Sequence, residues 1–302
     1  MADKVVLVGP LDRVLYLRTL PVFEPLGSEA LAAIAQHARE RFFRRGSTVL
    51  RPDRPAHAVF VVVDGLISIY RDARRVEDAG PGEAVGFLHL LSRTTEGIEA
   101  RADVDTLTLE LDWDAQLDVC EDHFPVLLQY VRYLSRRSVA ELSRIADGTR
   151  LGEPHDAPFV GPRALNLVER ILGLRRSRPF SRCSVDALSE LARHVVEERL
   201  RAGQPIWTRG TPAGHLLLVV SGSVRCHVDP GRAFLAGPGV TLGMHEALMD
   251  GVRWYDVVTA EDLVGLRIDV EPLVDILEDH FEMAIDLTSM MAVRLMELMK
   301  KQ

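Results

Sequence analysis

The side chains that most often perform catalysis or bind metals are scattered along this chain of 302 residues. A metal site built on an HxH pair also needs a Glu and a further His, and the sequence contains no HxH pair. His245-Glu246 alone is more typical of a helix surface than of a metal site. The GxSxG, P-loop and HExxH motifs are absent as well. We therefore predict no catalytic residue, no metal ligand and a protein that is not an enzyme.

Charge and cysteine content exclude further classes. Lysine and arginine number 36 against 44 aspartates and glutamates, a formal net charge of −8, and both halves are acidic, so neither half is a basic nucleic-acid module. Cys120, Cys183 and Cys226 lie far apart without CxxC spacing, which predicts buried or incidental thiols. The N-terminal segment is too short and too acidic for a signal peptide. The apolar runs are as long as β-strands and too short to span a membrane. These features predict a cytoplasmic protein without a membrane span.

An internal repeat organises the chain. One offset of 157 residues pairs Phe23 with Phe180 and Gly65 with Gly222. The same offset pairs the tetrapeptide 121–124 with 278–281, and it never changes over about a hundred residues. We predict a first domain at 1–146, a linker at 147–162 and a second domain at 163–302.

Each copy shows the same order of elements. An amphipathic helix behind a Ser cap opens it, and Val- and Ile-rich strands follow, joined by hairpin turns at Asp64-Gly65 and Ser221-Gly222. A last strand and a helical tail close it. The expected ranges are 28–39, 47–50, 58–63, 66–70, 106–111 and 124–146 in copy one, and 184–197, 205–208, 215–220, 223–227, 263–268 and 281–301 in copy two. The apolar set of the last helix fits packing on its own domain or a dimer contact.

Four segments carry a family resemblance: Leu15-x-Leu17-Arg18-x-Leu20-Pro21-x-Phe23-x-x-Leu26, Phe60-Val61-Val62-Val63-Asp64-Gly65, Gly80-Pro81-Gly82-Glu83 and Asp122-His123-Phe124. In this order they resemble the cyclic nucleotide-binding domain family, the module of catabolite activator proteins and protein kinase regulatory subunits. The resemblance covers both copies. It implies a mainly β fold with flanking helices, in the form of two tandem jelly-roll β-barrels.

The family binds its ligand on a phosphate-binding cassette, in which a Gly-Glu-x-Ala-Leu segment opens a short helix and an Arg follows about ten residues on. The helix N-terminus and the Arg hold the cyclic phosphate, and the Glu accepts the ribose hydroxyl. In copy one, Gly86 is followed by Phe87 and Leu88, and Glu96 takes the Arg position. A carboxylate there repels a phosphate, so this cassette is expected to be degenerate, with Arg93 or Arg101 the only rescue.

Of the Glu and the Arg that the family's cassette uses, copy two keeps only the Arg. Met244 takes the Glu position after Gly243, while Arg253 stands at the Arg position as a retained anion contact or a surface arginine. A shifted register would give Glu246 the ribose role, although the constant offset argues against it. Trp254 could stack on a base or fill the pocket. The candidate ligand-binding residues are Gly243, Met244, His245, Glu246, Ala247, Arg253 and Trp254.

These observations lead to two functional hypotheses. The first is a non-enzymatic regulatory or scaffold protein that acts through protein–protein interaction, with a homodimer through the terminal helices as one form. The alternative is a signalling regulator that binds a cyclic mononucleotide, a cyclic dinucleotide or another anion in the second domain. No cofactor is expected besides this ligand. DNA binding is not expected, because the residues after Phe281 form a helix and leave no helix-turn-helix.

Overall fold

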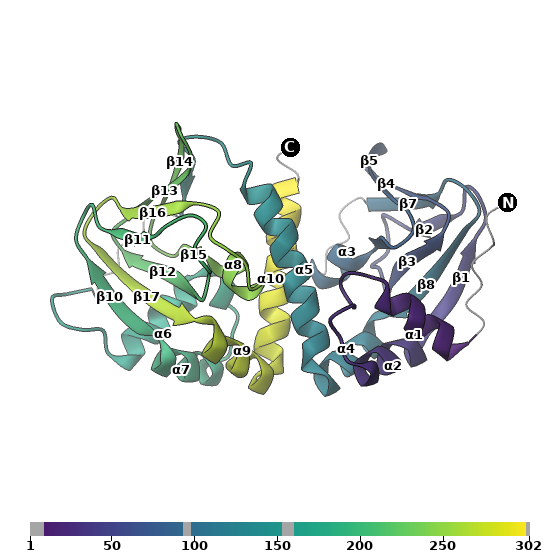
Figure 1. Cartoon of the computed structure of the whole chain (residues 1–302), viewed down its shortest axis with the longest axis horizontal. Coiled ribbons are helices and arrows are strands. Elements are labelled where there is room, and N and C mark those ends of the chain that lie inside the picture. Colours follow the sequence, from purple (N-terminus) through teal and green to yellow (C-terminus); the bar gives the residue numbers. More distant parts are fainter. Residues whose placement is uncertain (1–8, 93–97, 153–159, 300–302) are drawn as a thin grey trace. The chain divides into compact units, whose positions relative to one another are not determined.

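The computed structural model describes residues 9–92, 98–152 and 160–299. Contacts between Cα atoms divide the chain into two compact units, Met1–Tyr130 and Val131–Gln302, and each is described by itself (Figure 1). The division falls within helix α5 (Phe124–Leu142). The predicted domain limits at 146 and 163 stay a prediction.

Unit 1 contains two four-stranded antiparallel sheets with the orders β1-β8-β3-β6 and β2-β7-β4-β5. Helices α1 (Pro10–Arg18) and α2 (Ser28–His37) precede them, and α3 (Phe87–Ser92) and α4 (Trp113–Asp122) follow strands β6 and β8. The strands are β1 (Ala38–Phe43), β2 (Thr48–Leu50), β3 (Ala58–Asp64), β4 (Ile67–Arg71), β5 (Arg74–Ala79), β6 (Ala84–Val85), β7 (Ile98–Ala102) and β8 (Thr106–Asp112).

Unit 2 repeats this plan. Its sheets have the orders β10-β17-β12-β15 and β11-β16-β13-β14-β9, so each strand of unit 1 has a counterpart at the same place in its sheet. The helices are α6 (Leu167–Arg176), the 3-10 turn η1 (Arg178–Phe180), α7 (Val185–His194), α8 (Met244–Leu248), α9 (Val270–Asp279) and α10 (Phe281–Met299). The strands are β9 (Arg150–Leu151), β10 (Val196–Leu200), β11 (Pro205–Trp207), β12 (His215–Ser221), β13 (Val224–Asp229), β14 (Arg232–Ala236), β15 (Thr241–Leu242), β16 (Asp256–Thr259) and β17 (Leu263–Asp269).

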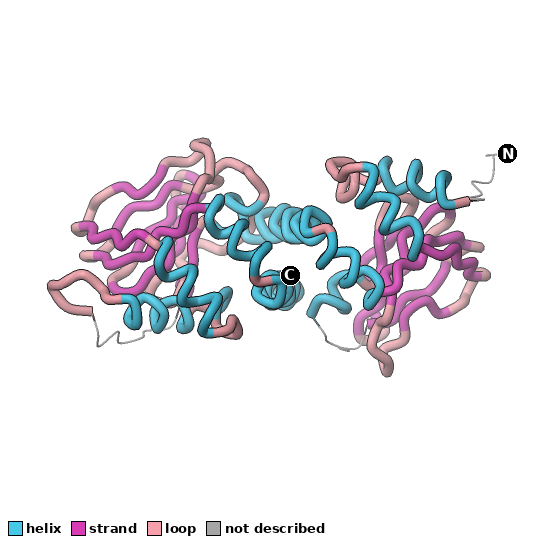
Figure 2. The backbone as a smooth tube through the Cα atoms, turned by 90° about the horizontal axis from the view of Figure 1, so that it is seen from below, coloured by secondary structure: helices cyan, strands magenta, loops and turns pink. Residues whose placement is uncertain are grey.

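This architecture confirms the predicted fold class of two tandem jelly-roll domains. In each unit the strands gather apart from the helices (Figure 2), and the sheets remain separate instead of closing into one barrel. The predicted hairpins at Asp64-Gly65 and Ser221-Gly222 are wrong, because the turn between β3 and β4 and the turn between β12 and β13 each join strands of two different sheets. Gly65 has φ +106°, and a Cβ there would lie 2.5 Å from Oγ1 of Thr106. Only glycine fits this turn without strain.

The opening helices of both copies are shorter than the sequence pattern predicts. Residues 38 and 39 belong to β1, and residues 196 and 197 belong to β10, so the predicted helices 28–39 and 184–197 run too far. β1 exposes most of its length and lacks the apolar alternation that reveals a strand. The cap of Ser184 is confirmed because its side chain accepts from the amide of Ala187. The cap of Ser28 is wrong, since Gly27 is the N-cap of α2.

Part of the predicted linker belongs to the second sheet of unit 2. β9 pairs in parallel with β14, matching Arg150 to Leu235. The Asp147 side chain accepts from the amide of Ala233 at 2.9 Å, and Arg232 donates to the carbonyl of Ser143 at 2.8 Å. Residues 143–151 therefore lie along one edge of this sheet.

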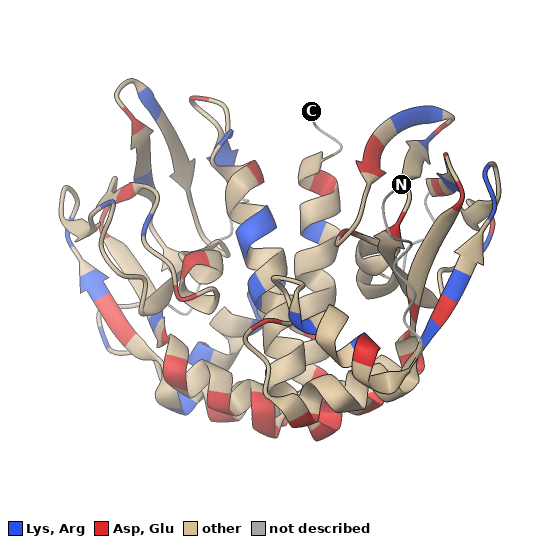
Figure 3. Cartoon of the chain, turned by 45° about the vertical axis from the view of Figure 1, so that its right-hand side comes forward, with Lys and Arg blue, Asp and Glu red and all other residues tan. Residues whose placement is uncertain are grey.

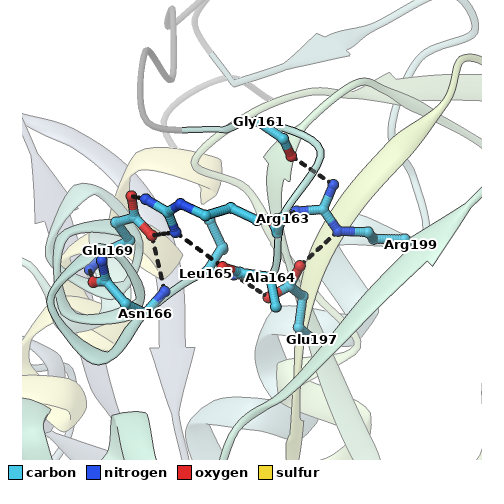
Figure 4. A network of polar contacts seen from close by, with 8 residues as sticks. All are labelled: Gly161, Arg163, Ala164, Leu165, Asn166, Glu169, Glu197 and Arg199. Atoms are coloured by element: carbon cyan, nitrogen blue, oxygen red, sulfur yellow. Dashed lines mark hydrogen bonds and ion pairs between the residues drawn. The ribbon is translucent and has the colours of Figure 1, made fainter.

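A polar network anchors the segment that leads into α6 (Figure 4). Arg163 donates to both carboxylate oxygens of Glu169, at 2.7 and 2.5 Å. Glu197 on β10 accepts from the amide of Leu165 at 2.6 Å and from Nε of Arg199 at 2.7 Å. Arg199 also donates to the carbonyls of Gly161 and Arg163. One strand thus fixes the backbone before α6 by charged hydrogen bonds.

Replacing Glu197 with alanine should destabilise unit 2 by about 1–3 kcal/mol, because the amide of Leu165 loses its acceptor. Urea unfolding followed by circular dichroism measures this loss. Glu261→Ala, at an exposed turn, is the matched control and should change the unfolding free energy by less than about 0.5 kcal/mol. Equal effects of the two variants would contradict an anchoring role for Glu197.

Candidate functional site

The cassette of unit 2 lies between β15 and α8 and turns at Gly243. Gly243 has φ +73°, in the left-handed region that favours glycine. A Cβ at this position would also collide with the guanidinium of Arg253. Both the left-handed backbone and the position of Arg253 therefore require a glycine at 243, the glycine predicted to open the second cassette.

Arg253 is the largest fully buried side chain among the described residues of unit 2. It is 1% exposed, so the interpretation as a surface arginine is wrong. Its Nη2 donates to the carbonyl of His215 at 2.5 Å, and its Nη1 donates to the carbonyl of Gly243 at 3.3 Å. The guanidinium carbon lies 4.0 Å from the centre of the Trp207 ring. Burial lowers the pKa of Arg253, and the side chain joins the cassette to β12.

Glu246 is a second buried charged group of this cassette. It is 2% exposed, and its Oε1 has no hydrogen-bond partner among the described residues. Burial raises the pKa of Glu246 to about 7, although a backbone hydrogen bond and Arg253 act in the opposite direction. Nδ1 of His245 also lacks a partner in the described part of the chain. Burial, reinforced by Arg294, lowers the pKa of His245 to about 4.

A cavity of about 540 Å³ lies beside the cassette, within unit 2. The cassette lines it from Thr241 to Glu246, and Trp254 and Tyr255 add aromatic surface. Four other elements, β9, α6, η1 and α10, contribute Arg150, Arg176, Arg178, Met290, Met291 and Arg294. Among the described residues, no group of three or more His, Cys, Asp or Glu is placed to hold a metal ion.

The cavity gathers most of the predicted ligand-binding residues. Gly243, Met244, His245, Glu246 and Trp254 line it. Ala247 is 3% exposed behind them, and neither it nor Arg253 is among the lining residues. The sequence prediction missed the arginines, because Arg150, Arg178 and Arg294 come from segments far from the cassette. No spacing in the sequence connects them to it.

Aromatic side chains form one wall of the cavity. The rings of Phe234 and Trp254 are stacked, with centroids 6.2 Å apart and an interplanar angle of 25°. Trp254 also meets Tyr255 edge-on at 4.5 Å, and the Tyr255 hydroxyl accepts from the amide of Gly243 at 3.1 Å. Tyr255 therefore fixes the cassette turn, while Trp254 presents a ring to the cavity.

The described part of the unit 1 cassette turns at a glycine and places an aromatic ring after it. Gly86 turns with φ +98°, and the ring of Phe87 meets Tyr130 of α5 at 5.0 Å, edge-on. Leu88 is half-buried beside it. Arg101 is exposed and pairs with Glu99 at 2.6 Å. Glu96 and Arg93 lie outside the described residues.

Each unit is a β-rich domain with a glycine-opened short helix between two strands. The sequence assigns the family: the model of the cyclic nucleotide-binding domain matches residues 40–123 and 197–280. The chain belongs to the cyclic nucleotide-binding domain family and carries two copies of the domain. No match is found among curated proteins.

Solved structures with a similar fold include the regulatory domain of Toxoplasma gondii PKA with cAMP, at 15% identity and a TM-score of 0.36, covering 92% of this chain and 97% of that one. The sensor domain of the transcriptional regulator DNR from Pseudomonas aeruginosa is 22% identical, with a TM-score of 0.40, covering 45% of this chain and 95% of its own. The N-terminal domain of a transcriptional regulator from Streptomyces coelicolor is 25% identical, with a TM-score of 0.38, covering 41% and 92%.

Replacing Arg253 with alanine should lower the free energy of unfolding by about 2–4 kcal/mol without any ligand, since two buried carbonyls lose a donor and a void opens. Chemical denaturation measures it, with the exposed Arg225→Ala as control. Arg253→Met keeps most of the side-chain volume and serves if the alanine variant does not fold. A loss no larger than that of Arg225→Ala would contradict a structural role.

Glu246→Gln should remove a pH dependence of stability. The pKa of Glu246 is raised from its ordinary 4.5 to about 7, so between these values the folded protein holds a proton that the unfolded chain has released. This stability is complete below the unfolded pKa and is lost as the pH rises through the folded pKa. At pH 8 the glutamine variant should therefore be more stable than wild type by roughly 2–4 kcal/mol.

Below pH 4.5 the two proteins should be about equally stable. His215 and His245 also titrate in this range, because burial lowers the pKa of each to about 4. The difference between the two pH profiles, measured by urea unfolding at each pH, removes their contribution. A difference independent of pH would contradict the raised pKa.

Proposed function

We propose that this protein is a ligand-responsive regulator that acts by binding and not by catalysis, with unit 2 as its sensor. The observation that carries the proposal is the cavity, because both the cassette and α10 line it. A ligand held there touches the domain and its last helix together. Occupancy can thus change the free energy of α10 relative to the sheets.

The lining favours an anionic ligand with an aromatic ring, such as a cyclic or linear nucleotide. The volume of about 540 Å³ lies in the range of small-molecule sites. The Trp254 ring offers a stacking surface for a base, and arginine forks match phosphate oxygens. Oε1 of Glu246 and Nδ1 of His245 are unsatisfied in the described structure, so a polar ligand edge would supply the partners that they need.

Unit 1 is proposed to be a degenerate copy that does not bind a cyclic nucleotide. Phe87 replaces the ribose acceptor, and its contact with Tyr130 joins the cassette to α5. This aromatic contact requires no ligand. Unit 1 then serves as an interaction module.

The output is proposed to be contact with a protein partner, which includes a second copy of the chain through the terminal helices. The described helices contain no segment long and apolar enough to cross a membrane. Cys120, Cys183 and Cys226 are all buried and unpaired, which is the usual state of thiols in a reducing compartment. On this support we place the protein in the cytoplasm, and its acidic charge argues against nucleic acid as the partner.

A panel of cAMP, cGMP, cyclic di-GMP, cyclic di-AMP, AMP and GMP should contain at least one compound that raises the midpoint of thermal unfolding. At one hundred times its dissociation constant a ligand adds about 2.7 kcal/mol to stability. Trp254→Leu should weaken this response at least tenfold in ligand concentration. Trp113→Leu, which removes a tryptophan of unit 1, is the matched control and should leave it unchanged.

The outcomes separate the two functions. A response that depends on Trp254 and not on Trp113 supports a sensor in unit 2. No response up to millimolar concentrations would overturn the sensor and leave the scaffold function alone.

A further inference from the structure

The cavity of unit 2 concentrates positive charge in an acidic chain. Among the described residues that line it, four are arginines and one, Glu246, carries a carboxylate. Elsewhere on both units basic and acidic segments are interspersed (Figure 3). Arg150 lies on β9, Arg176 ends α6, Arg178 begins η1 and Arg294 lies on α10. Cations from four separate elements therefore meet at one cavity, which favours an anion there.

Two of these arginines share one acid. Arg294 contacts Oε2 of Glu297 at 2.8 Å, and Arg178 contacts the same oxygen at 3.6 Å. Arg150 is exposed, and its side chain makes no hydrogen bond or ion pair within the described part of the chain. Arg178 and Arg294 thus share one carboxylate, and Arg150 has no acidic partner in the described part of the chain.

The cassette arginine cannot take the phosphate without giving up its own bonds. Arg253 is committed to the carbonyls of His215 and Gly243 and does not line the cavity. A phosphate in the cavity therefore meets Arg150, Arg178 and Arg294 first. One phosphodiester carries a single negative charge, and one guanidinium fork satisfies its two free oxygens. Three guanidinium groups on separate elements suit more than one phosphate.

From this placement we infer that the unit 2 cavity selects a nucleotide with two or more phosphate groups, held by Arg150, Arg178 and Arg294. The inference rests on the proposed sensor function and defines its ligand class. A terminal diphosphate and the two phosphodiesters of a cyclic dinucleotide share this chemistry. The base stacks on Trp254, and Glu246 accepts from a polar edge of the ligand.

Glu297 competes with the ligand for two of these arginines. A phosphate that binds Arg178 and Arg294 displaces the carboxylate that holds them. The last turns of α10 then lose their ion pair to η1 and gain a contact through the ligand. Affinity should therefore increase when Glu297 is neutralised.

Isothermal titration calorimetry of the full chain with GMP, GDP, GTP and cyclic di-GMP, and with the adenine counterparts, tests the inference. Titrations at fixed ionic strength in EDTA exclude divalent cations. We expect at least tenfold tighter binding for two phosphates than for one on the same base. Arg150→Ala and Arg294→Gln should each reduce the affinity for the two-phosphate ligand about tenfold and change that for the monophosphate less than threefold. Glu297→Gln should increase the former about threefold.

The control is Arg193→Ala, which removes an exposed arginine of α7 outside the cavity. If it weakens binding as much as Arg150→Ala, only the general charge matters and the inference fails. A monophosphate that binds as tightly as its diphosphate overturns the inference and leaves the sensor function intact. If no nucleotide binds, the sensor function fails as well.

Discussion

The buried guanidinium of Arg253 is the interaction on which unit 2 depends. An ionised group inside a protein core is stable only when its donors are satisfied. Here two backbone carbonyls accept from Nη1 and Nη2 and the Trp207 ring covers one face, while Nε has no partner among the described residues. The carbonyls belong to β12 and to the cassette turn, so this one side chain holds a sheet and the cassette together. The left-handed glycine at 243 follows from the same contact, because any side chain there would collide with the guanidinium.

This arrangement also determines the character of the cavity. Because Arg253 is turned toward carbonyls, the charges that face the cavity come from other elements, and Glu246 remains buried with an unsatisfied oxygen. Nearby positive charge lowers the pKa of Glu246, yet desolvation is larger and raises it to about 7. In unit 1, Phe87 of the cassette packs edge-on against Tyr130, and this aromatic contact involves no charged group.

The fold was predictable from the sequence, whereas the site was predictable only in part. The offset of 157 residues preserves apolar strands and turn glycines such as Gly65, and these are local signals. β1 and β10 escaped prediction because their exposed faces carry charged residues without apolar alternation. The cassette residues Gly243 to Glu246 line the cavity, and their role in ligand binding stays a prediction. The sequence did not predict that Arg150 and Arg294 line the cavity. Tertiary packing brings them to it from segments that no sequence spacing connects with the cassette.

Helix α10 limits how far a ligand can move this structure. Met283, Leu287, Met291 and Leu295 are buried within the chain, and each contributes about 1.5–3 kcal/mol through burial. The Arg178–Glu297 pair is largely exposed, and such pairs contribute about 0–1 kcal/mol. Exchange of that ion pair for a phosphate therefore cannot detach the whole helix. Met291 and Leu295 lie in the same turns as the ion pair, so the exchange can rearrange the side chains of Arg294 and Glu297 but not the helix that carries them.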